Sequence, residues 1–142
     1  MPAGTREVPL LFGALAPKAM ARMARWGQGY IGASFPAAMV EPFFDQARLA
    51  WTDAGREGSP RLVALAYYAF GDVDQGRANV FDYYRLLGKE TADMVSGTFP
   101  ANADSVRDVV KQFDDLGADE LIFNTTVPEL DQIAQLADAV LT

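Results

Sequence analysis

Four small or apolar residues stand between an apolar run and a helix that opens with Pro17 and Lys18. They are Gly13, Ala14, Leu15 and Ala16. Backbone N–H groups at the end of a strand and the start of a helix form an anion site, and small residues let a phosphate approach closely. We therefore predict that residues 13–16 contact a phosphate, with Lys18 adding a charge at the rim. The alternative is a structural turn in which Ala14 and Ala16 pack beneath the helix.

The composition excludes several kinds of site. The 142 residues include no histidine and no cysteine, which rules out Ser-His triads, histidine or thiolate metal sites and disulfides. Twelve Lys and Arg against 19 Asp and Glu give a net charge of -7, and this leaves no basic field for a nucleic acid or an anionic membrane. We expect no metal site, no nucleic-acid partner and no membrane partner.

The start of the sequence lacks the features of a signal peptide. Residues 1–7 are small and polar, and the apolar run behind them stops at Gly13. No apolar run approaches the roughly 18 residues of a membrane span. These features predict a cytoplasmic protein.

The hydrophobic pattern predicts four strands, each followed by a helix. Short apolar runs indicate strands over 8–12, 30–34, 61–70 and 120–125. Helical spacing with Pro and Gly boundaries indicates helices over 17–26, 38–54, 73–87 and about 102–116, and a last one from near Pro128. Residues 89–101 are ambiguous between a short helix around 91–95 and a loop. The pattern is that of an α/β domain over residues 1–142, either a half-barrel or a small open sheet.

Each helix is expected to bury one apolar stripe. The predicted inward residues are Met20, Met23 and Ala24; Met39, Phe43, Ala47, Ala50 and Trp51; Ala78, Phe81, Tyr84 and Leu87; Val106, Val109, Val110, Phe113 and Leu116; and Leu130, Ile133, Ala137 and Val140. The fourth of these stripes is the most regular, with intervals of three and four.

Three segments resemble the luciferase-like monooxygenases, which use flavin mononucleotide (FMN) or deazaflavin F420. They are the strand, turn and helix of Val8–Ala19 running on to Gly27–Ile31, the turn Ala54–Arg56, and the helix and strand of Asp114–Phe123. Relative to the family pattern, Ala14 follows Gly13 where a second glycine is usual. Ala16 replaces a hydroxyl residue, and Gln28 replaces an aspartate.

The family fold is a (β/α)8 TIM barrel of about 250 residues, so the resemblance implies that this chain supplies roughly the last four βα units. It implies a flavin- or F420-dependent oxidoreductase, with the cofactor phosphate at Gly13, Ala14, Leu15 and Ala16. We expect a homodimer, or a partner chain that supplies the missing half. The alternatives are a non-catalytic half-barrel that serves as an interaction or structural subunit, and an unrelated phosphate-binding α/β protein.

Other side chains have structural explanations at least as good as functional ones. Tyr67 and Tyr68 are adjacent in a strand and must point to opposite faces, so at most one could meet a flavin ring. The segment Asn124–Thr126 ends a strand at the face where barrel sites form, but a turn before Pro128 explains it equally well. The carboxylates are expected to be solvated charges; they are Asp114, Asp115, Asp119 and Glu120.

Overall fold

The structure, a computed structural model, describes residues 8–141. Residues 1–7, on which part of the signal-peptide argument rests, and residue 142 lie outside this range. The elements in chain order are β1 (Leu11–Phe12), α1 (Pro17–Trp26), β2 (Gly29–Ile31), α2 (Ala37–Asp53), β3 (Arg61–Tyr68), α3 (Val73–Tyr84), the 3₁₀ turn η1 (Arg85–Leu87), α4 (Lys89–Thr98), α5 (Ala103–Asp115), β4 (Glu120–Thr125) and α6 (Asp131–Leu141). The predicted alternation of strand and helix is confirmed.

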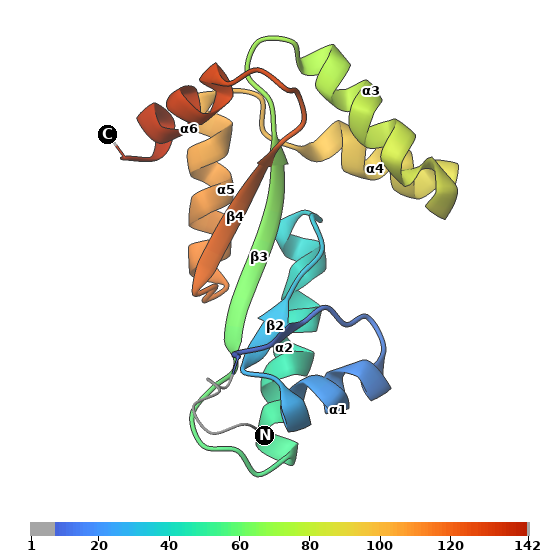
Figure 1. The fold of residues 1–142 in the computed structure, drawn as a ribbon, viewed down its shortest axis with the longest axis vertical. Coiled ribbons are helices and arrows are strands. Elements are labelled where there is room, and N and C mark those ends of the chain that lie inside the picture. Colours follow the sequence, from blue (N-terminus) through green and yellow to red (C-terminus); the bar gives the residue numbers. More distant parts are fainter. Residues whose placement is uncertain (1–7, 142) are drawn as a thin grey trace.

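The four strands form one parallel sheet in the order β1-β2-β3-β4 (Figure 1). Phe12 pairs with Tyr30, Tyr30 with Leu62, and Val63 with Glu120. Because each strand lies beside the next one in the chain, every crossover returns to the neighbouring position, as in a βα barrel.

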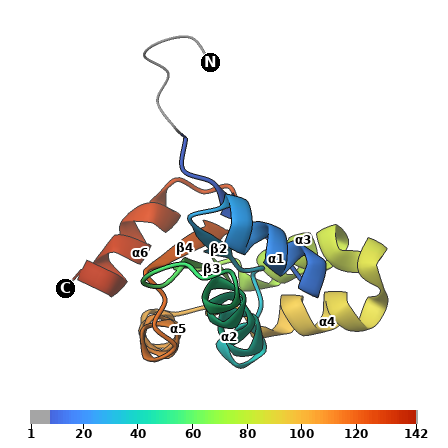
Figure 2. The same ribbon diagram turned by 90° about the horizontal axis from the view of Figure 1, so that it is seen from below.

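Helices cover one face of the sheet and leave the middle of the other face open, while Tyr67 near its carboxyl end packs against the cluster of α3 and α4. Figure 2 shows α2 and α5 on one side of the strands, with α1 and α6 at the two ends of the arc. Alternate residues of β3, including Leu62 and Ala64, enter a core with Met23, Phe44 and Phe113 from the helices. The residues that alternate with them along β3 point to the opposite face of the sheet.

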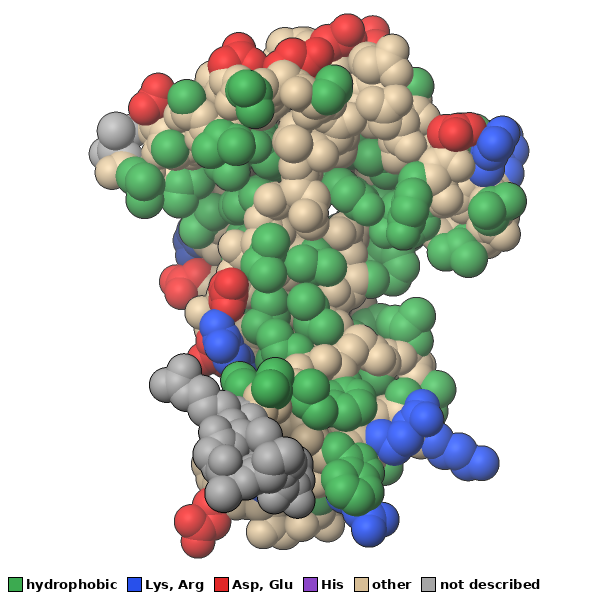
Figure 3. All heavy atoms as spheres, in the orientation of Figure 1, with side chains coloured by type: hydrophobic (Ala, Val, Ile, Leu, Met, Phe, Trp, Pro, Cys, Tyr) green, Lys and Arg blue, Asp and Glu red, His purple; other side chains and the backbone are tan. Residues whose placement is uncertain are grey.

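The open face carries apolar side chains. Leu65 is half-buried, and Ile122, its partner on β4, is 36% exposed. In Figure 3 hydrophobic side chains gather along the middle of this face, over β3 and β4. This is the face that would line the interior if the sheet closed into a barrel.

The strands are shorter than the apolar runs predicted. β1 is limited to Leu11–Phe12 beside a second strand of only three residues. Residues 69 and 70 leave the ladder, because the N–H of Ala69 donates to the Pro100 carbonyl and that of Phe70 to the side chain of Gln132. The pairing available to each strand, rather than its sequence, therefore sets its length.

The predicted buried faces hold for α1 and for the middle of α5. Met20, Met23 and Ala24 are buried, as are Val106 and Phe113, while Val109, Val110 and Leu116 are half-buried. The α5 helix is capped by Asn102, which forms a reciprocal capping box with Ser105. α5 is therefore well predicted from the sequence, because both its apolar stripe and its N-cap depend on residues within the segment itself.

The predicted faces of α2 and α3 are partly wrong. In α2 the residues buried are Ala37, Val40, Phe44, Ala47 and Trp51, whereas Met39 is 42% exposed. In α3 they are Gly76, Val80 and Tyr84, whereas Ala78 is exposed, as is Leu87, which lies in η1 beyond the end of the helix. Both stripes contain alternative apolar residues one position away, so spacing alone could not choose between them.

Residues 89–98 form a full helix, α4, rather than the short helix or loop considered from the sequence. It begins after Gly88, whose φ of 106° is accessible to glycine and rare for other residues. α4 packs against α3 in a separate core cluster that includes Val80, Tyr84, Ala92 and Val95. Tertiary packing, not a strong local stripe, therefore stabilises α4.

The last helix starts at Asp131, three residues after Pro128, and its buried residues are Gln132 and Ala139. The predicted inward residues Leu130, Ile133 and Val140 are 87%, 65% and 41% exposed, and Ala137 is half-buried. The apolar side of α6 therefore faces outward in the single chain. No helix within residues 8–141 is long and apolar enough to cross a membrane.

Candidate functional site

The loop of residues 13–16 lies at the carboxyl ends of β1 and β2, where it lines an open hollow of about 520 Å³. Ile31 and Leu65 contribute the opposite wall from the open face of the sheet. Ala14 is buried, at 7% exposure, whereas Leu15 is 61% exposed. The four residues singled out from the sequence are thus brought together with residues of β2 and β3 at one end of the sheet.

The start of α1 is electrostatically suited to an anion. Ala16 occupies the N-cap position without a side-chain hydrogen bond, Pro17 follows it, and no acidic residue lies in the first turn. The Ala16 carbonyl accepts the N–H groups of Ala19 and Met20. The positive end of the helix dipole therefore has no compensating carboxylate within this turn, and Lys18 adds a full positive charge there.

The walls of the hollow can bind but offer little acid–base chemistry. None of the residues that line it has a charged side chain. Tyr30 is its one phenol, and this residue is 1% exposed with its ring edge-on to Phe44 at 6.0 Å. Burial raises the pKa of Tyr30, so its hydroxyl stays protonated across the physiological range.

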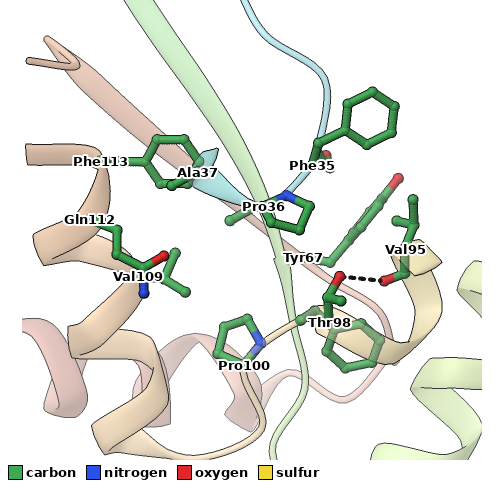
Figure 4. A pocket seen from close by; sticks show the side chains of 13 residues that line it. Phe35, Pro36, Ala37, Tyr67, Val95, Thr98, Pro100, Val109, Gln112 and Phe113 are labelled. Carbon is green, nitrogen blue, oxygen red and sulfur yellow. Dashed lines mark hydrogen bonds between the residues drawn. The ribbon is translucent and has the colours of Figure 1, made fainter. Parts of the chain in front are cut away.

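A second, smaller cavity of about 130 Å³ lies beside the carboxyl half of β3 (Figure 4). Phe35, Val95 and Phe113 supply apolar walls, and Gln112 and Thr98 supply polar groups. The Thr98 hydroxyl is already bonded to the carbonyls of Met94 and Val95. This cavity could not be predicted from the sequence, because its walls come from four separate elements.

The two adjacent tyrosines of β3 point to opposite sides, as predicted. Tyr68 packs against Phe70 and Phe123, and burial raises its pKa while a hydrogen bond with Thr125 lowers it. Tyr67 packs edge-on to Tyr84 at 6.2 Å, in the cluster of α3 and α4. Burial, with a contribution from Tyr67, raises the pKa of Tyr84. Both β3 tyrosines therefore have packing partners in the single chain.

The sequence allows the residues at the end of β4 to be either part of a site or a structural turn, and the structure distinguishes among them. Thr126 is structural, because its N–H and its hydroxyl both donate to the Tyr68 carbonyl and its own carbonyl accepts from Asn79. Thr125 also bonds locally, to the Val127 carbonyl. Asn124 pairs with Tyr67 in the sheet register and lies on the open face. It is the member of this segment best placed to border a site.

Two of the four carboxylates do more than face solvent. Asp119 accepts the N–H of Leu62 at 2.7 Å and donates its own N–H to the Leu62 carbonyl at 2.8 Å, which extends the β3–β4 ladder. Glu120 pairs with Arg61 on the neighbouring strand. Asp119 is exposed and Glu120 is half-buried, so both remain in contact with solvent as expected, and both also bond to β3. Asp114 and Asp115 are exposed, and Asp115 bonds Lys111.

No family model and no curated protein matches the chain by sequence. Solved structures do match. Over 96% of its length the chain resembles an F420-dependent secondary alcohol dehydrogenase in complex with an F420-acetone adduct, with a TM-score of 0.75 and 15% identity. Over 92% it resembles a coenzyme F420 dependent tetrahydromethanopterin reductase from Methanopyrus kandleri, with a TM-score of 0.61 and 17% identity.

A third match is apo-MsnO8, with a TM-score of 0.57 and 20% identity over 98% of the chain. The chain spans 49%, 52% and 49% of the dehydrogenase, apo-MsnO8 and the reductase, which is about half of each. The F420-dependent neighbours are TIM barrels. The chain has a four-stranded parallel α/β fold that matches about half of these barrels. At 15–20% sequence identity, the similarity to these structures shows a shared fold and nothing more.

Proposed function

We propose that residues 1–142 form the cofactor-phosphate half of a flavin- or F420-dependent, luciferase-like oxidoreductase, which becomes competent when a second half closes the barrel. The observation that carries this proposal is the position of the loop 13–16. It lines a hollow at the carboxyl ends of parallel strands, where βα barrels hold their ligands, and it leads directly into a helix N-terminus. We place the protein in the cytoplasm.

The residues present fit one end of such a cofactor. A volume of about 520 Å³ is within the range of small-molecule sites, and its apolar walls suit a planar ring or its linker. The uncapped start of α1, with Lys18, suits the phosphate of FMN or F420. When bound, the cofactor would supply the hydride chemistry, and the residues of this chain would hold and orient it.

The choice between F420 and FMN rests on the fold neighbours, two of which are F420-dependent by name. We therefore favour F420. The alternative function, a non-catalytic half-barrel subunit, draws support from the same hollow, because its lining residues include no charged group for proton transfer. Cofactor binding distinguishes the two.

Ala16 offers a sharper test than Ala14. Ala14 packs into the main core cluster, so Ala14→Leu would overpack the core as well as block the loop. Ala16 is exposed and is the N-cap of α1, a position that favours Asp and Asn. Ala16→Asp should therefore stabilise α1 while its charge repels a phosphate, and Ala16→Asn should stabilise α1 without that charge.

The measurement is titration of F420 and of FMN into the wild type and both variants, with inorganic phosphate as competitor and thermal melts in parallel. We expect Ala16→Asp to bind at least about ten-fold more weakly than Ala16→Asn, with melting temperatures at or above that of the wild type. Binding that is equally tight in all three proteins and insensitive to phosphate would show that the cofactor phosphate does not bind at this loop. If neither cofactor binds at all, the non-catalytic alternative replaces the proposal.

A further inference from the structure

The exposed apolar side chains concentrate at the two ends of the sheet. Fifteen large apolar residues are exposed within residues 8–141, and ten of them belong to the first and last βα units. On the β1 side they are Val8, Leu10, Leu11, Leu15 and Trp26; on the β4 side they are Ile122, Leu130, Ile133, Val140 and Leu141. β1 and β4 are also the edge strands, each paired on one side only. Both ends therefore have the composition of surfaces that become buried.

The helices at these ends carry opposite charges. The charged residues of α1 are Lys18, Arg22 and Arg25, with no acid among them. Those of α6 are Asp131 and Asp138, with no base among them. The two helices have 10 and 11 residues, so they match in length. A helix like α6 is thus a suitable neighbour for α1 in both charge and size.

We propose that two copies of this chain associate head to tail around a common twofold axis, with β4 of each copy pairing in parallel with β1 of the other. The eight strands then close into a barrel, and a barrel of eight strands is narrow enough for side chains to fill its interior. In that barrel α1 of one copy lies beside α6 of the second, which covers both exposed apolar surfaces. This assembly does not depend on which cofactor the hollow holds.

The register of the new strand pair follows from the observed one. The row of paired residues through Phe12, Tyr30 and Leu62 reaches residue 119 next to β4. An eight-stranded βα barrel has a total shear of about eight residues, so each identical half must contribute about four. A stagger of four toward the carboxyl end sets β1 of the second copy alongside β4. The opposite stagger would set it beside the turn between α5 and β4.

With this stagger Leu11 of one copy meets Ile122 of the other, and Gly13 meets Asn124. Leu11 and Ile122 are 38% and 36% exposed, and both lie on the open face of the sheet, because each is one residue from a partner of the helix-covered face. A stagger of three or five would pair residues of opposite faces. The matching faces therefore support the value of four.

The site is completed by the second copy. Asn124 lies at the carboxyl end of β4, so closure sets its amide at the open side of the hollow formed by residues 13–16 of the other copy. Each barrel then contains two equivalent hollows on the same face. An amide can donate and accept hydrogen bonds, whereas the side chains that line the hollow are apolar except for the buried Tyr30.

Engineered cysteines test this arrangement without interference, because the chain has no cysteine. In the double variant Leu11→Cys/Ile122→Cys the two thiols of one chain are three strand spacings apart, about 14 Å, and beyond disulfide reach. Oxidation with oxidised glutathione should therefore yield a covalent dimer. Neither single variant should cross-link to itself, whereas a mixture of the two should. The control is Leu11→Cys/Phe123→Cys, since Phe123 packs on the helix-covered face.

We expect at least about ten-fold more covalent dimer from Leu11→Cys/Ile122→Cys than from the control. A self-cross-link in Ile122→Cys alone would indicate head-to-head pairing of β4 edges and overturn the proposal. Sedimentation of the unmodified wild type provides an independent measurement: a species of only 15.4 kDa at micromolar concentration would overturn it as well. Because neither readout involves a cofactor, failure here leaves the proposed phosphate site untouched.

Discussion

Strand β3 and strand β1 have similarly apolar sequences and very different surroundings. β3 has a hydrogen-bonded neighbour on each side and eight residues, with Leu62, Val63 and Ala64 at 2% exposure or less. β1 has one neighbour and two residues, and Leu10 and Leu11 are 49% and 38% exposed. The comparison shows that burial in this chain depends on position in the sheet, since apolarity alone would have buried both strands.

The same contrast separates the helices. α5 covers the middle of the sheet and buries Phe113 at 2% exposure, while α6 stands at the end of the arc and leaves Ile133 65% exposed. α6 is fastened to the sheet by a polar contact, in which the Gln132 side chain bonds both the N–H and the carbonyl of Phe70 at 2.8 Å. The centre is therefore held by apolar packing, whereas at this end a smaller apolar cluster around Ala139 is supplemented by the buried bonds of Gln132.

The largest effect is expected from Phe113→Asp in the centre. The change would leave a cavity and a buried unpaired charge, and the combined cost of about 5 kcal/mol or more approaches the whole stability of a small domain. We expect an insoluble protein or one without a cooperative thermal melt. Val109→Asp should be milder because Val109 is half-buried at the wall of the cavity in Figure 4.

Lys111→Asp is the matched control on the same helix. Lys111 is exposed, and its ion pair with Asp115 raises its pKa. Loss of an exposed, solvent-screened pair of this kind has little effect on stability. Equal melting temperatures for Phe113→Asp and Lys111→Asp would show that the buried face of α5 is misplaced.

Substitution of two glycines allows the inner strand β2 to be compared with the segment that follows the edge strand β1. A Cβ at Gly29 would lie 2.0 Å from the Arg61 carbonyl oxygen, so Gly29→Ala must push β2 away from β3. At Gly13 the nearest such atom is the Ile31 carbonyl oxygen at 3.7 Å, an ordinary contact. Urea unfolding should show a loss of about 2–3 kcal/mol for Gly29→Ala and a change within about 0.5 kcal/mol for Gly13→Ala. Similar losses of stability in both variants would show that the backbone is packed equally tightly at Gly13 and Gly29.

The smallest effect is expected where α6 meets the sheet. Gln132→Ala would leave the N–H and carbonyl of Phe70 without their partner in a buried position, at a cost of about 2 kcal/mol. Hydrogen exchange should show faster exchange at the Phe70 amide and within α6, with the β3 amides little changed. Gln135→Ala, on the exposed side of α6, is the control and should leave exchange unchanged. Uniform acceleration across β3 would mean that α6 and the centre unfold as one unit.

The sequence by itself determined the alternation of strands and helices, the buried stripe of α5 with its Asn102 cap, and the turn of residues 13–16. These features depend on residues a few positions apart, because helical and strand periodicity, capping and proline or glycine boundaries act locally. The apolar run 61–70 likewise predicted a strand without knowledge of its neighbours, although the strand itself ends at Tyr68.

Only the tertiary structure decided which apolar residues are buried and which polar residues bond. The contacts of Gln132 with Phe70 and of Thr126 with Tyr68 join positions about 60 residues apart, and they exist because parallel pairing of β3 and β4 brings those segments together. The exposure of Ile133 and Leu130 follows from the same cause. A helical stripe is buried only if another layer lies against it. Because α6 is the last helix of the arc, the side of it that carries Ile133 and Val140 is left exposed within the described part of the chain.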